Sequence, residues 1–171
     1  MKKTWLWGSR LYGTAGPDSD WDFIVIGDET RQLAIGDINI NSYTDEDFQA
    51  LVAAHDITAL ECLSQEPEPL TIDLLILRTS ISTKASHSWV KAKKLLTVEN
   101  EVYRAQKSLF HSLRILDYGI QLADNKRIIC FDDVSYWWEE ILKHDPDWEI
   151  WQAVFKPLYN ALCTDFRKKA P

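Results

Sequence analysis

Two aspartates lie two residues apart in front of an apolar run, with Asp20 and Asp22 preceding the sequence FIVI at 23–26. Side chains alternate between the two faces of a β-strand, so both carboxylates are expected on one face of a strand that the apolar run anchors in the core. Carboxylates this close repel each other unless a cation lies between them. Because Mg²⁺ binds one or two carboxylates together with substrate phosphates, the pair predicts a divalent-metal site.

A third carboxylate is expected from the next predicted strand, GDININSY at 36–43. Asp37, Asn39 and Asn41 share one face of that strand, and Asp37 is the only carboxylate among them. Three acids holding two metal ions can activate an attacking hydroxyl and stabilise a leaving pyrophosphate. We therefore expect Asp37 to complete the set with Asp20 and Asp22. Asn39 remains an alternative third ligand because of its position on the same face. Asp73 is a further candidate, although a structural role is favoured for it.

A glycine and a serine follow the first predicted strand, TWLW at 4–7. At a turn into a short helix, Gly8 and Ser9 would let backbone N–H groups and a hydroxyl approach phosphate oxygens closely. Arg10 adds positive charge beside them. The sequence has no GK[ST] element, which excludes a P-loop.

Two other interpretations of the acidic stretch have to be weighed. Asp18, Asp20, Asp22 and Glu29 have the spacing of positions 1, 3, 5 and 12 of a calcium-binding EF-hand loop. Position 6 would then be Phe23 instead of the glycine that such a loop needs, and the following run is too apolar for a loop. Aspartate and serine also favour ordinary turns. The metal site is preferred because the strand behind the acids holds them in place.

The elements that must position these residues form an α+β pattern. Strands are expected at 4–7, 22–27 and 36–43, with a turn at 28–34 and either a strand or a buried helix start at 71–77. Helices are expected at 45–55, with Thr44 as the N-cap, and at 58–63, 89–96, 99–122, 133–144 and 147–169, the last of them kinked at Pro157.

The polar segment 78–88 suggests a boundary between a catalytic domain at 1–83 and a helical domain at 84–171. The net charge of −7 is unevenly divided, because the first part carries −9 and the second +2. A polyanionic partner would therefore have to bind the second part or bind through metal ions. No apolar run reaches the ~20 residues of a membrane span, and the first residues lack the apolar region of a signal peptide. Three widely spaced cysteines suit a reducing cytoplasm.

The predicted helix at 99–122 has an apolar face and, opposite it, a basic face that includes Lys107, His111 and Arg114. These three residues either line a cleft over a nucleotide or are simply solvated. A second basic cluster at 91–94 is interpreted as solvated. Glu61, in an otherwise apolar helix, is either a capping or ion-pairing residue or a group near the site. Core packing is the default for the eight tryptophans, although one of them could stack on a base.

The pattern Gly8-Ser9-x-x-x-Gly13-Thr14, followed by Ser19-Asp20-x-Asp22 and an apolar strand, resembles the signature of the DNA polymerase beta nucleotidyltransferase superfamily. The form GSRxYG at 8–13, with ITALECL at 57–63, is more narrowly similar to the YcgL-type, RNA-repair-associated nucleotidyltransferases. The resemblance implies a nucleotidyltransferase core with a small mixed sheet, with Gly8 and Ser9 at the triphosphate. It also implies metal on Asp20 and Asp22 and a third acid on the next strand.

The expected function is transfer of an NMP from an NTP to an acceptor hydroxyl with release of pyrophosphate. Two Mg²⁺ ions are expected, with Mn²⁺ able to substitute. The narrower resemblance implies an RNA acceptor, such as a tRNA or a broken RNA end. Nucleotidylation of a protein partner is the nearest alternative, and a non-catalytic nucleotide- or RNA-binding module is another. No membrane partner is expected, and the sequence does not determine the oligomeric state.

Overall fold

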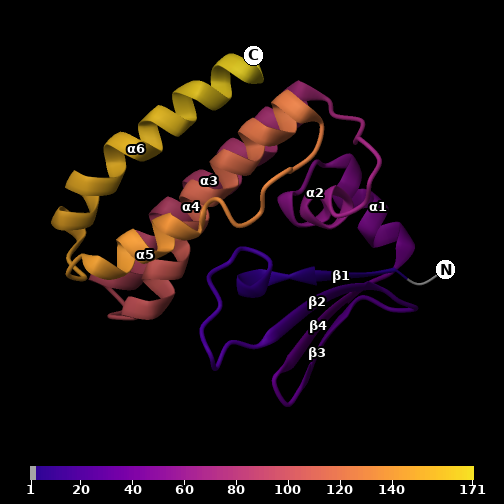
Figure 1. Cartoon of the computed structure of the whole chain (residues 1–171), viewed down its shortest axis with the longest axis horizontal. Coiled ribbons are helices and arrows are strands. Elements are labelled where there is room, and N and C mark those ends of the chain that lie inside the picture. The colour runs from indigo at the N-terminus through magenta and orange to yellow at the C-terminus, as the bar shows by residue number, and fades with distance from the viewer. Residues whose placement is uncertain (1–2) are drawn as a thin grey trace.

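The computed structural model describes residues 3–171, which form a small sheet layer and a larger helical layer (Figure 1). The sheet has the strand order β1-β2-β4-β3, formed by β1 (Thr4–Trp7), β2 (Trp21–Ile26), β3 (Arg31–Ile35) and β4 (Ile38–Tyr43). The central strands β2 and β4 are parallel, and the two edge strands pair antiparallel to them. The strand expected at 36–43 therefore does lie beside the strand that follows the acids. The fold class is α+β, as predicted.

Strand β3 was not predicted, because 28–34 was interpreted as a turn. Its sequence RQLAI has little apolar alternation, and every residue in it except Leu33 is exposed. The strand is recruited by a hairpin with β4, in which Ile35 pairs with Ile38 across the turn at Gly36, whose φ is +61°. Backbone hydrogen bonding to β4, more than burial, therefore forms this edge strand.

Two short helices cover one face of the sheet. Helix α1 (Asp45–Ala53) begins at the predicted cap, where the Thr44 hydroxyl accepts a hydrogen bond from the Asp47 N–H at 3.1 Å. Helix α2 (Ile57–Ser64) is capped by Asp56 in the same way. A small apolar core forms between these helices and the sheet from Trp5, Ile24, Phe48, Ala59 and Cys62. The covered face is the one onto which Ile24 and, two residues earlier, Asp22 project.

The helical layer consists of α3 (Leu74–Thr97), α4 (Val102–Asn125), α5 (Ser135–Lys143) and α6 (Trp148–Lys169). Helix α4 packs closely against α3 and α6, because a Cβ at Gly119 would lie 2.7 Å from Ile81 and 3.1 Å from the Phe166 ring. No helix of residues 3–171 has the length and apolarity to cross a lipid bilayer.

Residues 71–77, left open between strand and helix, contain the start of α3. Asp73 caps this helix by accepting hydrogen bonds from the N–H groups of Leu75 and Ile76, which agrees with a structural role. The polar segment 78–88 is also helical, with its Ser and Thr side chains on the outside while Leu77, Ile81 and others at helical spacing are buried. The proposed division at 83/84 thus falls inside a continuous helix.

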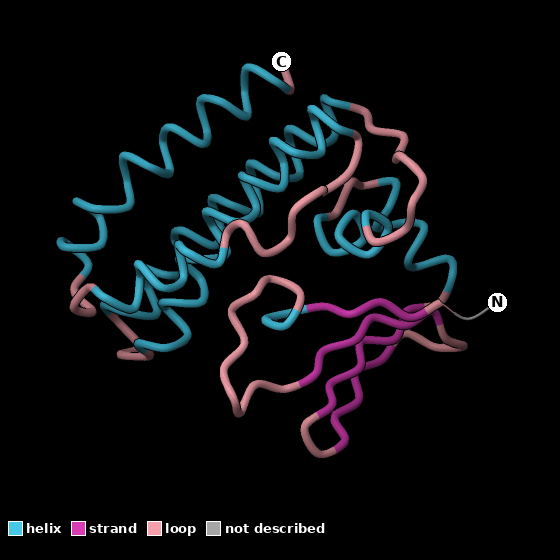
Figure 2. The backbone as a smooth tube through the Cα atoms, viewed as in Figure 1, coloured by secondary structure: helices cyan, strands magenta, loops and turns pink. Residues whose placement is uncertain are grey.

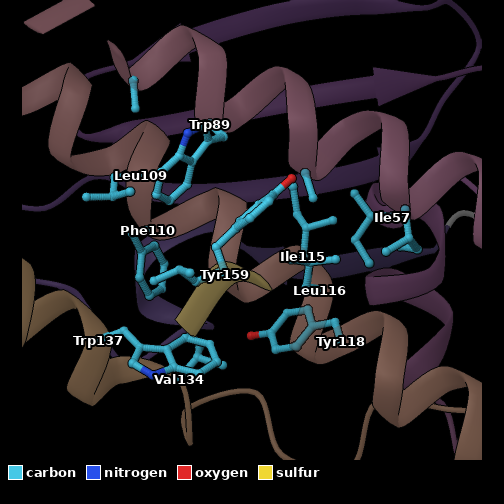
Figure 3. Close-up of a cluster of buried hydrophobic side chains, with 14 of the residues drawn as sticks. Ile57, Trp89, Leu109, Phe110, Ile115, Leu116, Tyr118, Val134, Trp137 and Tyr159 are labelled. Carbon is cyan, nitrogen blue, oxygen red and sulfur yellow. The ribbon is translucent and has the colours of Figure 1, made fainter. Parts of the chain in front are cut away.

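One apolar cluster connects the two layers. It contains Tyr12 from the loop after β1, together with Ile57 and Leu60 of α2, packed with side chains from α3, α4, α5 and α6. Figure 3 shows Ile57 near Ile115 and Leu116 of α4 in this cluster. The helical layer is therefore held against α2 and the loop after β1 by a shared core.

Candidate active site

The turn after β1 brings the backbone directly against Asp22. The 3₁₀-helix η1 (Gly8–Arg10) starts at Gly8, a buried residue with φ of +74°. A Cβ at this position would lie 2.2 Å from Asp22 Oδ2, which is closer than any side chain permits. Trp7 is the β1 residue that pairs with Asp22. Glycine is required here both for the left-handed backbone and for the close approach of a carboxylate.

The two aspartates lie on one face, as strand alternation predicts. The register of the parallel pair sets Asn39 of β4 beside Asp22 of β2. The Asn39 amide nitrogen donates to Asp22 Oδ1 at 3.1 Å and to Asp20 Oδ2 at 3.2 Å. Turning this amide over would present its carbonyl oxygen to the same space. The arrangement therefore offers two carboxylates and one amide, all sources of hard oxygen ligands.

Asp37, the expected third ligand, occupies the turn before β4, where its backbone carbonyl accepts a hydrogen bond from the Trp21 N–H at 2.7 Å. Among the residues that the structure describes, no three His, Cys, Asp or Glu side chains are grouped so as to hold a metal ion. The structure brings Asn39, the alternative third ligand on the same strand, to the aspartate pair. The strand register selects this residue, because β4 begins at Ile38 and Asn39 is directly opposite Asp22.

Arg10 organises the loop that carries the acids. Its guanidinium donates to the carbonyls of Ser19 at 2.6 Å and Asp20 at 3.3 Å, and it lies 4.1 Å from the ring centroid of Trp21. Figure 2 shows this segment as an irregular loop between η1 and β2. Two of the five N–H donors of Arg10 are thus used on the loop backbone, and its contact with nucleotide stays a prediction.

A cleft opens between this turn and the helical layer. It consists of two neighbouring cavities of about 180 Å³ and 480 Å³ that share lining residues from both layers. The shared residues are Ser9, Thr14, Asp22, Tyr103, Lys107 and Trp138. The larger cavity also reaches Asp20, and the smaller one reaches Gly8 and His111. The predicted phosphate turn, the acid pair and two of the three predicted basic residues therefore face one space.

Of the three predicted basic residues on α4, Arg114 is the one that does not line the cleft. It is buried in an ion pair with Glu61, which is also buried. Glu61 accepts further hydrogen bonds from Trp7 Nε1 at 2.7 Å and from the Tyr12 hydroxyl at 2.8 Å. Burial by itself would lower the pKa of Arg114, but the charge of Glu61, together with Tyr12, Tyr118 and the hydrogen bond to Glu61, outweighs it and raises that pKa. Arg114 thus connects α4 to α2. Of the two roles considered for Glu61, ion pairing and a place near the site, the structure shows ion pairing.

His111 connects this buried pair to the cleft. Its Nδ1 accepts a hydrogen bond from Arg114 Nε at 3.3 Å. Burial, reinforced by the positive charges of Arg114, Lys107 and Lys91, holds the pKa of His111 well below its ordinary value. The ring is therefore neutral at pH 7, and its single proton is on Nε2 because Nδ1 acts as the acceptor. The place of His111 on the basic face of the helix is visible in the sequence, whereas its tautomer depends on the contact with Arg114 in the folded protein.

Aromatic side chains form the wall of the cleft on the helical side. The rings of Tyr103 and Phe110 both meet Trp138 edge-on, with centroids 6.1 Å and 6.0 Å away. The Lys107 ammonium lies 4.6 Å from the centroid of Tyr103. Flat aromatic surfaces next to a cation suit a base attached to phosphates. Trp138, from α5, is one of the tryptophans exposed to this space, a role that the sequence could not assign to a particular residue.

The mixed sheet with its flanking helices, together with acids at the start of β2 opposite a Gly-Ser turn, belongs to the α+β class of nucleotidyltransferase cores. The model of the nucleotidyltransferase domain family matches residues 2–96, and the chain is a member of that family. The match supports the resemblance to the polymerase beta-like superfamily. It covers the whole sheet and almost all of α3, which ends at Thr97. No curated protein and no solved structure matches the chain.

Proposed function

We propose that the protein transfers a nucleoside monophosphate from an NTP to a hydroxyl of RNA and releases pyrophosphate. Transfer of a nucleotide in general follows from the family, and the RNA acceptor is the proposed part. The observation that carries the proposal is the Asp20–Asp22 pair opening into the same cleft as the Gly8–Ser9 turn. The only side-chain donor that reaches both carboxylates, among residues 3–171, is the Asn39 amide.

The donor set fits a divalent metal ion. Asp20 and Asp22 project to one side, no Lys or Arg side chain in the described residues pairs with them, and the neighbouring amide can add an oxygen. We propose that these residues hold Mg²⁺, as two ions, with Mn²⁺ able to replace it. Bound there, the metal ions would supply charge stabilisation on phosphate oxygens and activation of the attacking hydroxyl.

The remaining lining residues would bind and orient the nucleotide. The backbone at Gly8 and Ser9 faces the space next to Asp22, where phosphate oxygens would lie. Lys107 contributes positive charge at the same opening, and Trp138 offers a face for the base. His111 would donate a hydrogen bond from Nε2 to an acceptor atom of the ligand. Catalysis in this arrangement depends on positioning and charge stabilisation.

Support for RNA as the acceptor comes from the narrower similarity to YcgL-type, RNA-repair-associated enzymes and from the charge of residues 84–171, which is +2 against −9 for the rest. Nucleotidylation of a protein is the nearest alternative acceptor. The cytoplasmic location expected from the cysteines stays a prediction.

One observation favours a second candidate, a nucleotide-binding module that carries out no transfer. The resemblance implies a third acid on the strand beside β2, and the side chain found there is Asn39. A site with two carboxylates and an amide would still bind a metal-nucleotide complex.

The experiment that tests the proposal is incubation with each α-labelled NTP in Mg²⁺ or Mn²⁺, offering total RNA and total protein as separate acceptors. Label in RNA supports the proposal, and label in protein supports the alternative acceptor. Nucleotide binding without label in either fraction supports the binding module. The double variant Asp20→Ala/Asp22→Ala should lose the label, whereas Glu46→Gln, an exposed acid on α1, should retain it. Full labelling by the double variant would overturn the metal assignment.

A further inference from the structure

A second concave surface lies away from the cleft, between α3 and α6. In Figure 1, α6 runs along the side of the helical layer that is distant from the sheet. A groove of about 720 Å³ separates it from α3. Helix α6 contributes Lys156, Asn160, Thr164 and Arg167, which follow one another at helical spacing and form one stripe. The eleven residue-to-residue steps from Lys156 to Arg167 make this stripe ~16 Å long.

The lining of this groove is cationic and rich in hydrogen-bond donors. It contains hydroxyl groups of Ser82 and Ser86 from α3, and it contains no carboxylate. Within residues 3–171, neither Lys156 nor Arg167 has an ion-pair partner. Lys169, on the same helix, is instead paired with Asp124. The two groove cations are thus available to an anionic ligand.

Aromatic rings hold one of these cations in place. The Lys156 ammonium lies 4.7 Å from the centroid of Trp89 and 4.5 Å from that of Tyr159. The two rings are themselves in contact, with centroids 4.7 Å apart, and Figure 3 shows them side by side. A cation over aromatic faces keeps its charge and part of its hydration, so it can still meet a phosphate.

The groove continues along α6. A further cavity of about 850 Å³ shares Lys156 and Asn160 with it and adds Lys93 from α3 and the carboxylate of Glu149 from α6. This cavity follows α6 toward its first residue, Trp148. Residues 144–147 join that end to α5, the helix that carries Trp138 to the cleft. The concave surface therefore extends along α6 as far as Trp148.

We infer that the groove between α3 and α6 binds the phosphodiester backbone of the acceptor RNA and anchors it while the RNA end occupies the cleft. The inference rests on the proposed function for the identity of the ligand. Cations separated by hydroxyl and amide groups suit a chain with regularly spaced phosphates. The acidic sheet part repels such a chain, so the helical layer is the surface on which it can bind.

The test is binding of a labelled, short single-stranded RNA, followed by fluorescence anisotropy in EDTA without NTP over a range of salt concentrations. Lys156→Gln/Arg167→Gln should weaken binding of unrelated sequences equally and reduce the slope of log affinity against log salt by about 1.4, since each contact contributes about 0.7 for single strands. The matched control is Lys168→Gln, an exposed lysine next to Arg167 that does not line the groove, and it should bind nearly as the unmodified protein does.

Three results would overturn the inference: unchanged affinity and slope in the double variant, an equal loss in Lys168→Gln, or displacement of the RNA by polyglutamate at the same charge concentration. The last result would indicate an acidic protein partner. Because the assay contains neither NTP nor metal, RNA binding that persists in Asp20→Ala/Asp22→Ala supports the groove even if no transfer is ever detected. Failure of the groove and failure of the proposed reaction are therefore separable.

Discussion

Two clusters of charge lie where the sheet layer meets the helical layer, and they are built differently. The Glu61–Arg114 pair is buried, and Trp7 and Tyr12 complete the hydrogen bonding of its carboxylate. Asp20 and Asp22 stand at the cleft with one shared amide between them. A buried charge is tolerated only when its partners are in place, whereas a charge that must bind a ligand has to remain incompletely paired. Complete pairing therefore identifies Glu61–Arg114 as a structural cluster, and incomplete pairing identifies Asp20–Asp22 as a binding cluster.

The largest expected effect comes from breaking the buried pair. Glu61→Leu leaves the Arg114 guanidinium buried without its partner and should lower the free energy of unfolding by about 3–5 kcal/mol. Urea denaturation followed by far-UV circular dichroism measures it. Glu61→Leu/Arg114→Met should recover much of the loss, and Glu101→Gln, which removes an exposed ion pair, should cost less than about 1 kcal/mol. A loss below 1 kcal/mol for Glu61→Leu would contradict this interpretation of the pair.

The second effect is on the binding cluster. Gly8→Ala forces the turn away from Asp22, and a displacement of that size should reduce nucleotide transfer by about 100-fold. Gly36→Ala is the matched control, because Gly36 also has a positive φ but no atom lies within 4 Å of the added methyl group. An equal loss of activity in the two variants would show that backbone strain, and not the contact with Asp22, governs the site.

The third prediction concerns His111, which joins the two clusters. Its pKa is lowered in the folded protein, so the unfolded chain binds a proton more readily, and stability should fall as the pH drops below about 6.5. One such group contributes at most about 1.4 kcal/mol per pH unit. Urea unfolding at pH 7.5 and at pH 5 measures the fall in the free energy of unfolding between the two pH values. This fall should be smaller in His111→Gln than in the unmodified protein. The variant His87→Gln, at an exposed position, should behave as the unmodified protein; no difference between the two variants would refute the assignment.

The smallest effect sharpens the comparison at Asn39. Asn39→Asp adds a third carboxylate to the binding cluster. In EDTA, mutual repulsion should lower the free energy of unfolding by roughly 1 kcal/mol, which corresponds to a fall of about 2–4 °C in the melting temperature. Addition of Mg²⁺ should recover this loss and stabilise the variant more than it stabilises the unmodified protein. Asn41→Asp, two residues further along β4, should respond less to Mg²⁺. A variant whose melting temperature is insensitive to Mg²⁺ would argue against a metal at this position.

Local pattern accounts for much of the fold. Alternation set Asp20 and Asp22 on one face, Thr44 marked the start of α1, and α4, α5 and α6 lie close to their expected ranges. Helix α3 was expected only at 89–96 and begins at Leu74. Strand β3 was missed because its own side chains carry no burial signal. The polar segment at 78–88 lies inside α3, and its helical character was not evident from the sequence because only a few of its positions, at helical spacing, are buried.

The sequence by itself determined the chemistry at the start of β2, because residue type and a two-residue period are local properties. Only the tertiary structure decided which partners those residues have. Strand register set Asn39 beside the aspartates, the loop backbone engaged Arg10, and the buried carboxylate of Glu61 drew Arg114 away from the cleft. These outcomes depend on long-range contacts between segments up to 53 residues apart, and a local pattern carries no information about which distant group satisfies a charge.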